Sequence, residues 1–154
     1  RVGVNTSVSW PTGVAAAKND GVAAIVGQTP GAIGYVELIY ALQTKIPFAA
    51  VQNAAGEFVT ASLEAVTAAA AGTNMPDDFR VSITNAPGKD AYPISSFTWI
   101  LLYERSQDKA RSATMVDFMR WALTDGQKLA PQLHYAPLPQ PVVEKEMTKL
   151  GRVQ

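Results

Sequence analysis

Apolar residues recur at helical spacing in several parts of the chain, with turn-rich segments between them. Asn19 or Asp20 can cap the first helical segment, and Gly72 stands where a left-handed residue is expected to end the third. The spacing predicts helices over about 20–28, 37–43, 61–71, 109–124 and 140–150.

Shorter apolar runs predict strands between these helices. The run "AIGYV", residues 32–36, reads as a short buried strand in which Gly34 permits close approach of a neighbouring backbone. The runs "FAAV" and "EFVT" flank a turn that contains Asn53 and Gly56, which predicts a hairpin. The most continuously apolar run, "SSFTWILLY" at 95–103, predicts a central strand. Strands separated by helices favour an α/β architecture.

Composition excludes several classes of protein. The 154 residues, 47% of them hydrophobic, are enough for one compact domain or for a piece of a two-lobed protein. Thirteen basic residues balance 13 acidic ones without a run of like sign, so we expect no nucleic-acid partner. Cysteine is absent, which excludes disulfides and thiolate chemistry. The chain starts without Met and without a signal-like segment, so we expect a mature form or a fragment.

Residues suited to catalysis or metal binding are sparse. His134, the only histidine, precedes a proline-punctuated loop, and no serine is spaced to form a triad with it. The carboxylates show no calcium-loop spacing, and "GAIGYVE" lacks the glycine patterns of nucleotide-binding loops. We therefore expect a protein that is not an enzyme and uses no cofactor or metal.

The stretch "KNDG" offers a weak candidate for anion binding. A helix that begins near Asn19, Asp20 and Gly21 presents free backbone N–H groups, and Gly34 could bring a further backbone close to a ligand. Asp20 would repel an anion. An ordinary helix cap at 19–21 and a scaffold role for Gly34 remain open as alternatives.

Several motifs together resemble one protein family. "SVSWPTG", "KNDGVAAIVGQTPGAIGYVELIYALQ", "YPISSFTWILLY", "VDFMRWALTDGQ" and "LHYAPLPQPVV" occur in the order found in the phosphate-binding proteins of bacterial phosphate ABC transporters. The resemblance covers almost the whole chain. It implies a type II periplasmic-binding fold, in which two α/β lobes hold one dehydrated phosphate between them.

The resemblance also implies that this chain is the C-terminal portion of such a protein. Residues 1–92 would belong to the second lobe, and 93–154 would return to the first lobe through a hinge near Tyr92-Pro93. The family's main anion-binding loop, of the form Arg-x-Asp-Gly-Ser-Gly-Thr, is not found here. Its binding residues therefore cannot be carried over to this sequence.

Two functions follow as expectations. In the first, the chain belongs to a periplasmic or extracytoplasmic receptor that captures inorganic phosphate for an ABC permease, with which it associates at the membrane. In the second, it is a truncated or split scaffold or interaction domain that does not bind phosphate. Its expected partners are then the missing N-terminal portion or a second copy.

Overall fold

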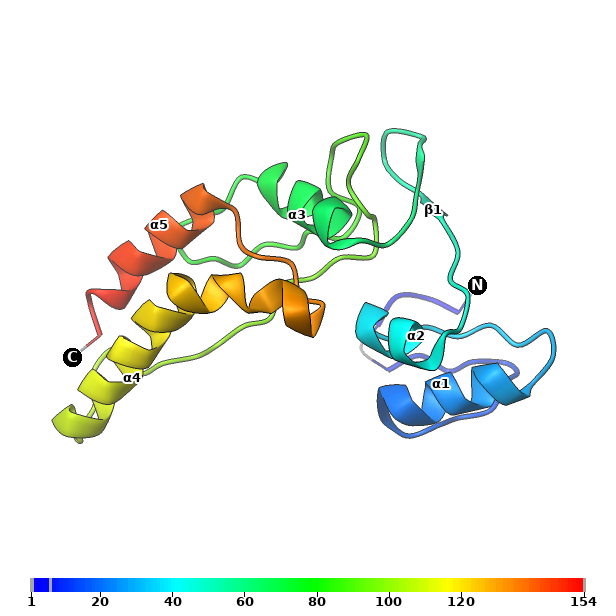
Figure 1. The fold of residues 1–154 in the computed structure, drawn as a ribbon, viewed down its shortest axis with the longest axis horizontal. Helices are drawn as coiled ribbons and strands as arrows, with labels where there is room; N and C mark the ends of the chain where they lie inside the picture. The colour runs from blue at the N-terminus through cyan, green and yellow to red at the C-terminus, as the bar shows by residue number, and fades with distance from the viewer. Residues whose placement is uncertain (1, 6, 154) are drawn as a thin grey trace. The chain divides into compact units, whose positions relative to one another are not determined.

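The computed structural model describes residues 2–5 and 7–153, and the chain divides into two compact units, Arg1–Pro47 and Phe48–Gln154. The helices and strands, labelled in Figure 1, are α1 (Lys18–Gln28), α2 (Leu38–Thr44), β1 (Val51–Gln52), β2 (Phe58–Val59), α3 (Leu63–Ala71), α4 (Lys109–Leu123) and α5 (Gln140–Leu150). Two short 3₁₀ helices, Asp125–Lys128 and Ala130–Leu133, lie between α4 and α5. Each predicted helix is confirmed to within about three residues at either end.

The first unit is built on the pairing of α1 with α2. Among the described residues of this unit, the buried side chains are Ala23 of α1 and Ala41 of α2, because only small residues fit where two helices approach closely. The segment between the helices lies against α1: a Cβ built on Gly34 would meet Val26 Cγ2 at 2.8 Å and Val22 Cγ1 at 3.1 Å. A close approach at Gly34 is therefore present, but it is made by the valine side chains of α1 and not by a neighbouring backbone as predicted.

Replacing Gly34 with alanine is expected to lower the free energy of unfolding by about 1 kcal/mol, because the added methyl group overpacks the contact with Val26. Gly27→Ala is the matched control. A Cβ at Gly27 would lie 3.7 Å from Ile46, which is an ordinary van der Waals distance. Because alanine favours the helix more than glycine does, Gly27→Ala should raise the free energy of unfolding by about 0.5–1 kcal/mol. Chemical denaturation measures both. Effects of the same sign would contradict the packing described for Gly34.

In the second unit, the predicted hairpin is present and leads into α3. β1 and β2 pair antiparallel, with Val51 opposite Val59 and Gln52 opposite Phe58. The Ser62 side chain then caps α3 by accepting a hydrogen bond from the Ala65 backbone N–H at 3.1 Å.

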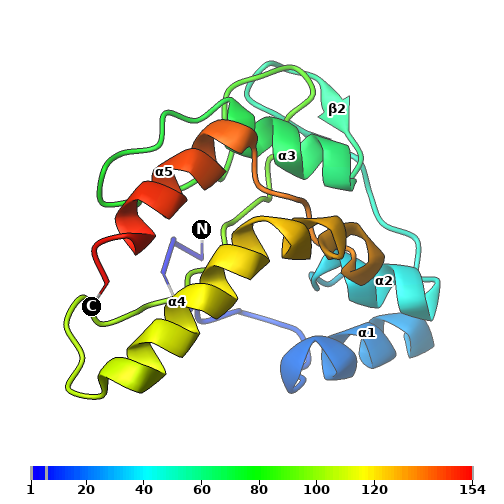
Figure 2. The ribbon, with the colours of Figure 1, turned by 60° about the vertical axis from the view of Figure 1, so that its left-hand side comes forward.

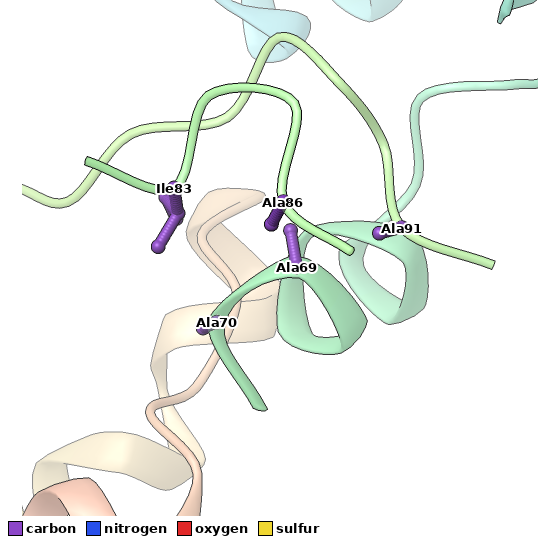
Figure 3. Close-up of a cluster of buried hydrophobic side chains, with 5 residues drawn as sticks. All are labelled: Ala69, Ala70, Ile83, Ala86 and Ala91. Atoms are coloured by element: carbon purple, nitrogen blue, oxygen red, sulfur yellow. The ribbon is translucent and has the colours of Figure 1, made fainter. Parts of the chain in front are cut away.

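The core beneath α3 consists almost entirely of small residues. Figure 3 shows Ala69 pointing from α3 toward Ala86 of the following loop, with Ala91 close by. Ala69 and Ala91 are fully buried, and Ile83 is the one large side chain of the described residues that is exposed by less than 2%. Small side chains let the loop lie directly on the helix, so the long 73–95 connection is held without regular secondary structure.

The second core lies between α4 and α5, which run side by side in Figures 1 and 2. Asp108 caps α4 by accepting a hydrogen bond from the Arg111 backbone N–H at 2.9 Å. Buried Leu123, Val143 and Leu150 form the centre of this core. Partly buried residues pack around them: Leu102, Val116, Met119, Leu138, Met147 and Val153. Val116, Met119 and Leu123, which lie at helical spacing, thus form the packed face of α4.

Two predicted strands are wrong. Residues 32–36 and 95–103 have no regular secondary structure, and the described residues contain one two-stranded sheet, β1–β2. A strand requires a neighbouring backbone to complete its hydrogen bonds, whatever its side chains favour. Within the part of the chain that the structure describes, no backbone segment pairs with either run.

Two predicted helix ends are also corrected. α1 begins one residue before Asn19, and its N-cap, Ala17, provides no side-chain hydrogen bond. Gly72 is right-handed, with a φ of −74°. Its lack of a side chain serves a different purpose, because a Cβ there would lie 2.6 Å from the Pro87 carbonyl oxygen. Glycine at 72 permits a close backbone approach and does not provide a left-handed cap.

Candidate functional site

The first predicted site, at the start of α1, has two of its polar groups in hydrogen bonds within the first unit. The Asn19 Oδ1 accepts a hydrogen bond from the Glu37 backbone N–H at 3.2 Å, and the Gly21 N–H donates to the Ala17 carbonyl at 3.2 Å. Asp20 is exposed in the first turn of α1. The positive end of the helix dipole is still available to a ligand, but the negative charge of Asp20 opposes the binding of an anion there.

Asn19 and Gly34 belong to one packed arrangement. The bond from Glu37 ties the start of α2 to the start of α1, and Gly34 lies against Val22 and Val26. The structure therefore brings Asn19, Asp20 and Gly21 near the segment that contains Gly34. It supplies a structural reason for Asn19 and Gly34 that needs no ligand.

A depression of about 560 Å³ lies beside β2 and the start of α3. Its charged residues are three carboxylates, Glu57, Glu64 and Asp90, and the single cation Lys89, whose Nζ lies 3.7 Å from Asp90 Oδ2. A backbone N–H and the Ser62 hydroxyl hold the pKa of the Glu64 carboxyl below its usual value. The depression is therefore net negative at neutral pH and unsuited to a phosphate dianion.

A second depression, of about 440 Å³, lies between the 98–102 segment and the α4–α5 core. Its walls include Ile100, Leu102, Met119 and Leu150, and burial raises the pKa of the Glu146 carboxyl on its rim. Its lining also holds more carboxylates than cations: Asp77, Asp78, Glu104 and Glu146 against Lys149 and Arg152. This charge balance does not favour a phosphate dianion. The apolar walls are suited to contact with other apolar groups.

One ion pair, made by Lys145 of α5, holds the 75–79 loop beside this depression. The Lys145 ammonium donates hydrogen bonds to Asp77 Oδ1 at 2.8 Å and to the Met75 carbonyl at 2.6 Å. The hydrogen bond and charge of Lys145 hold the pKa of the Asp77 carboxyl below its usual value of 3.8. A carboxyl whose pKa is lower in the folded state than in the unfolded state stabilises the folded state at pH values above its unfolded pKa. This stabilisation is lost as the pH falls through the folded pKa.

Asp77→Asn should therefore make the free energy of unfolding depend less on pH between about 5 and 2 than in the parent chain. The effect is expected to be small because Asp77 is exposed. Denaturant unfolding across this pH range measures it. Asp78→Asn, at the neighbouring exposed carboxylate, is the control. An equal reduction by both variants would show that the Lys145 pair is not responsible.

Asn53 has a role that the sequence did not reveal. Its side chain is buried, and Nδ2 lies within 3.1 Å of the carbonyl oxygens of Gly88, Lys89 and Ala91. Its Oδ1 accepts hydrogen bonds from the Ala55 and Glu57 backbone N–H groups. Asn53 was predicted only as a turn residue, because nothing near it in sequence indicates a contact more than 30 residues away. It joins the hairpin to the 88–91 loop beside the first depression.

The other predicted features show no catalytic arrangement. His134 is exposed in a left-handed conformation at the end of the second 3₁₀ helix, as expected for a residue that faces solvent. Among the described residues, no three His, Cys, Asp or Glu side chains are grouped to hold a metal ion. No helix within residues 2–5 and 7–153 is long and apolar enough to span a membrane.

Comparison with known proteins identifies relatives over almost the whole chain. A protein named phosphate-binding protein PstS from Xylella fastidiosa (strain 9a5c) is 46% identical over 147 residues, which are 94% of this chain and 40% of that protein. Proteins of the same name from Pasteurella multocida (strain Pm70) and Methanocaldococcus jannaschii are 38% and 37% identical, and the chain covers 42% and 44% of them. The chain thus spans less than half the length of these curated relatives.

A family model supports the same relationship independently. The model described as a PBP superfamily domain matches residues 4–126, which cover most of the first unit and the part of the second unit that ends just after α4. This match confirms the predicted fold class, a type II periplasmic-binding fold in which this chain supplies mixed α and β elements. The chain belongs to the PBP superfamily.

Proposed function

We propose that this chain is part of an extracytoplasmic solute-binding protein that captures inorganic phosphate for an ABC importer. The observation that carries the proposal is the 46% identity with a phosphate-binding protein over 94% of this chain. In such a receptor, the anion is held by hydrogen bonds between two closing lobes, without catalysis. The permease of the importer is its proposed partner.

The surfaces of this chain support the view that another part of the longer protein supplies most of the phosphate ligands. Neither of the two depressions favours a dianion, because carboxylates outnumber cations in both linings. Recognition of a dehydrated dianion requires several donors at once, since each unpaired buried group costs about 1–3 kcal/mol. We therefore propose that most phosphate ligands come from the remaining part of the protein and that this chain alone binds phosphate weakly or not at all.

Calorimetry at neutral pH tests both parts of the proposal. The longer protein that contains this chain is expected to bind phosphate, and the isolated 154-residue chain is expected to show no binding in the micromolar range. No binding by the longer protein would overturn the proposed function and favour the scaffold alternative. Micromolar binding by the isolated chain would show that it carries a complete site.

We propose that the start of α1, at Asn19, Asp20 and Gly21, is the part of this chain nearest the anion, with Gly34 beside it. The donors would be the Asn19 and Asp20 backbone N–H groups, because the Gly21 N–H donates to the Ala17 carbonyl. The first turn of a helix favours a bound anion, and the exposed Asp20 carboxylate opposes it. In the longer protein, Asp20→Asn should then tighten phosphate binding several-fold. The control is Asp117→Asn, at an exposed position of α4. An unchanged phosphate affinity of the Asp20→Asn variant would show that the start of α1 does not contribute to the site.

We also propose that the lobes divide as the sequence predicted, with 1–92 in one lobe and 93–154 returning to the other. The position of Pro93 supports this reading, because proline restrains Tyr92 to the extended geometry that suits a chain crossing between lobes. In this structure, the region around Tyr92-Pro93 is hydrogen-bonded locally: the Asn85 N–H donates to the Pro93 carbonyl at 2.7 Å, and the Tyr92 N–H donates to the Ala65 carbonyl at 3.1 Å. A structure of the longer protein tests the division.

A further inference from the structure

Strand β2 of the hairpin has one edge that is not paired. Within the described residues, β1 and β2 form a two-stranded sheet in which Gln52 lies opposite Phe58. The Asn53 N–H donates to the Glu57 carbonyl at 2.9 Å, so the 53–57 pair is hydrogen-bonded and the adjacent 52–58 pair is not. The N–H and carbonyl groups of Phe58 therefore point away from β1, toward the outer edge of β2.

The first depression follows this outer edge. Four consecutive residues, 57–60, line it, whereas Val51 and Gln52 of β1 do not. Successive side chains of a strand point to opposite faces, so four residues in a row share one depression along the edge of the strand. Outside the ladder with β1, no hydrogen bond joins the backbone of Phe58 or Thr60 to a described residue. The depression thus contains backbone donors and acceptors that an additional strand can use.

The lining combines negative charge with an exposed aromatic ring. Its carboxylates are Glu57, Glu64 and Asp90, and its cation is Lys89. The side chains of Lys89 and Asp90 are 79% and 75% exposed, so their 3.7 Å ion pair is weak and can be exchanged for another. Phe58 is 70% exposed. A ligand that fits this lining carries positive charge and also has groups that can contact an aromatic ring.

We propose that the outer edge of β2 is a docking site for an extended basic segment of another protein, which adds to the hairpin as a third strand. The backbone of this segment pairs with the N–H and carbonyl groups of Phe58. Glu57 and Phe58 point to opposite faces of the strand, so a segment with alternating basic and apolar side chains matches both. This docking is additional to the proposed capture of phosphate and does not depend on it.

Two other occupants fit the edge less well. A second copy of this chain would bring an edge with the same excess of carboxylates, so edge-to-edge pairing would place like charges opposite each other. A metal ion leaves the backbone groups of β2 unpaired, and no three acidic, histidine or cysteine side chains among the described residues are grouped to hold one. A basic strand satisfies both the charge and the backbone, which is why we choose it.

The test uses a short fluorescent peptide of alternating lysine and valine. Anisotropy should show saturable binding to the 154-residue chain and to the longer protein that contains it, weakened at least about tenfold in about 0.5 M salt. Amide exchange at Phe58 and Thr60 should slow at least about tenfold in the complex. A glutamate–valine peptide, and the lysine–valine peptide with N-methyl groups along its backbone, should not bind. Binding of the N-methylated peptide, or no binding by the longer protein, would overturn the proposal.

Two double variants test the contribution of charge. Glu57→Gln with Asp90→Asn should weaken peptide binding at least about tenfold. The matched control is Asp117→Asn with Glu144→Gln, which changes the net charge equally at exposed positions of α4 and α5 and should alter the affinity by less than about twofold. Equal losses in the two double variants would mean that the peptide responds only to net charge, which contradicts docking at β2.

Two substitutions of Phe58 test the backbone pairing. Phe58→Ala removes the ring, and Phe58→Pro removes both the ring and the outward N–H, a donor that the ladder with β1 does not need. Phe58→Pro should therefore bind the peptide at least about tenfold more weakly than Phe58→Ala. Circular dichroism checks that both variants remain folded, and the N-methylated peptide tests the same pairing without any substitution. Equal affinities of two folded Phe58 variants would rule out strand addition at this edge.

Discussion

Replacing Asn53 with alanine is expected to lower the free energy of unfolding by about 3 kcal/mol, because the change removes every hydrogen bond of a buried side chain, including the one to the carbonyl of buried Ala91. The Asn53 amide lies 3.1, 2.9 and 3.1 Å from the carbonyl oxygens of Gly88, Lys89 and Ala91, and its oxygen accepts from two N–H groups of the hairpin turn. No other side chain joins these two loops among the described hydrogen bonds. Urea unfolding followed by circular dichroism measures the loss.

Two further variants make the Asn53 prediction specific. Asn53→Asp keeps the acceptor but turns a carboxylate oxygen toward the carbonyl oxygens, so it should destabilise at least as much as alanine. Gln52→Ala is the control, since its amide makes one exposed hydrogen bond to the Gly56 carbonyl, and its effect should stay within about 0.5 kcal/mol. Comparable losses at Gln52 and Asn53 would show that the hairpin turn, and not the bond to the 88–91 loop, is responsible.

Replacing Ile83 with alanine is also expected to cost about 3 kcal/mol, because a large buried side chain is removed from a core of otherwise small residues. Ile83 is only 1% exposed and packs in the cluster that contains Ala69 and Ala86. Alanine side chains cannot extend to fill the space that remains. Ile83→Val removes one methylene and should cost about 1 kcal/mol.

The matched control for Ile83 is Ile94→Ala. Ile94 is 65% exposed in the same unit, so the identical chemical change should alter stability by less than about 0.5 kcal/mol. Thermal or urea unfolding distinguishes the two sites. Equal effects of Ile83→Ala and Ile94→Ala would contradict the packing of the alanine core.

The small-residue core also explains why the sequence was only partly informative about the second unit. The Ala-rich run was correctly predicted as a helix because alanine favours helices on its own. Its alanines do not, however, indicate which segment will lie against them. The Gly72 contact with the Pro87 carbonyl and the burial of Ala86 and Ala91 became evident only from the structure.

The candidate site was predictable to a still smaller extent. Asn19, Asp20, Gly21 and Gly34 were selected from the local pattern of a helix start and two glycines, and the structure does bring them into one unit. Their local pattern did not reveal that Asn19 is bonded to Glu37, eighteen residues away. The family relationship came from the order of motifs along the chain, which no single residue provides.

By itself, the sequence determined the helices and the hairpin. Helical hydrogen bonds and the tight hairpin turn join residues close together in the chain, so the local pattern of apolar and turn-forming residues contains most of the necessary information. The tertiary structure alone decided that 95–103 is extended without strand pairing, that Asn53 joins the hairpin to the 88–91 loop, and that Lys145 binds Asp77. These features depend on contacts between distant segments, and a strand in particular exists only where another backbone completes its hydrogen bonds.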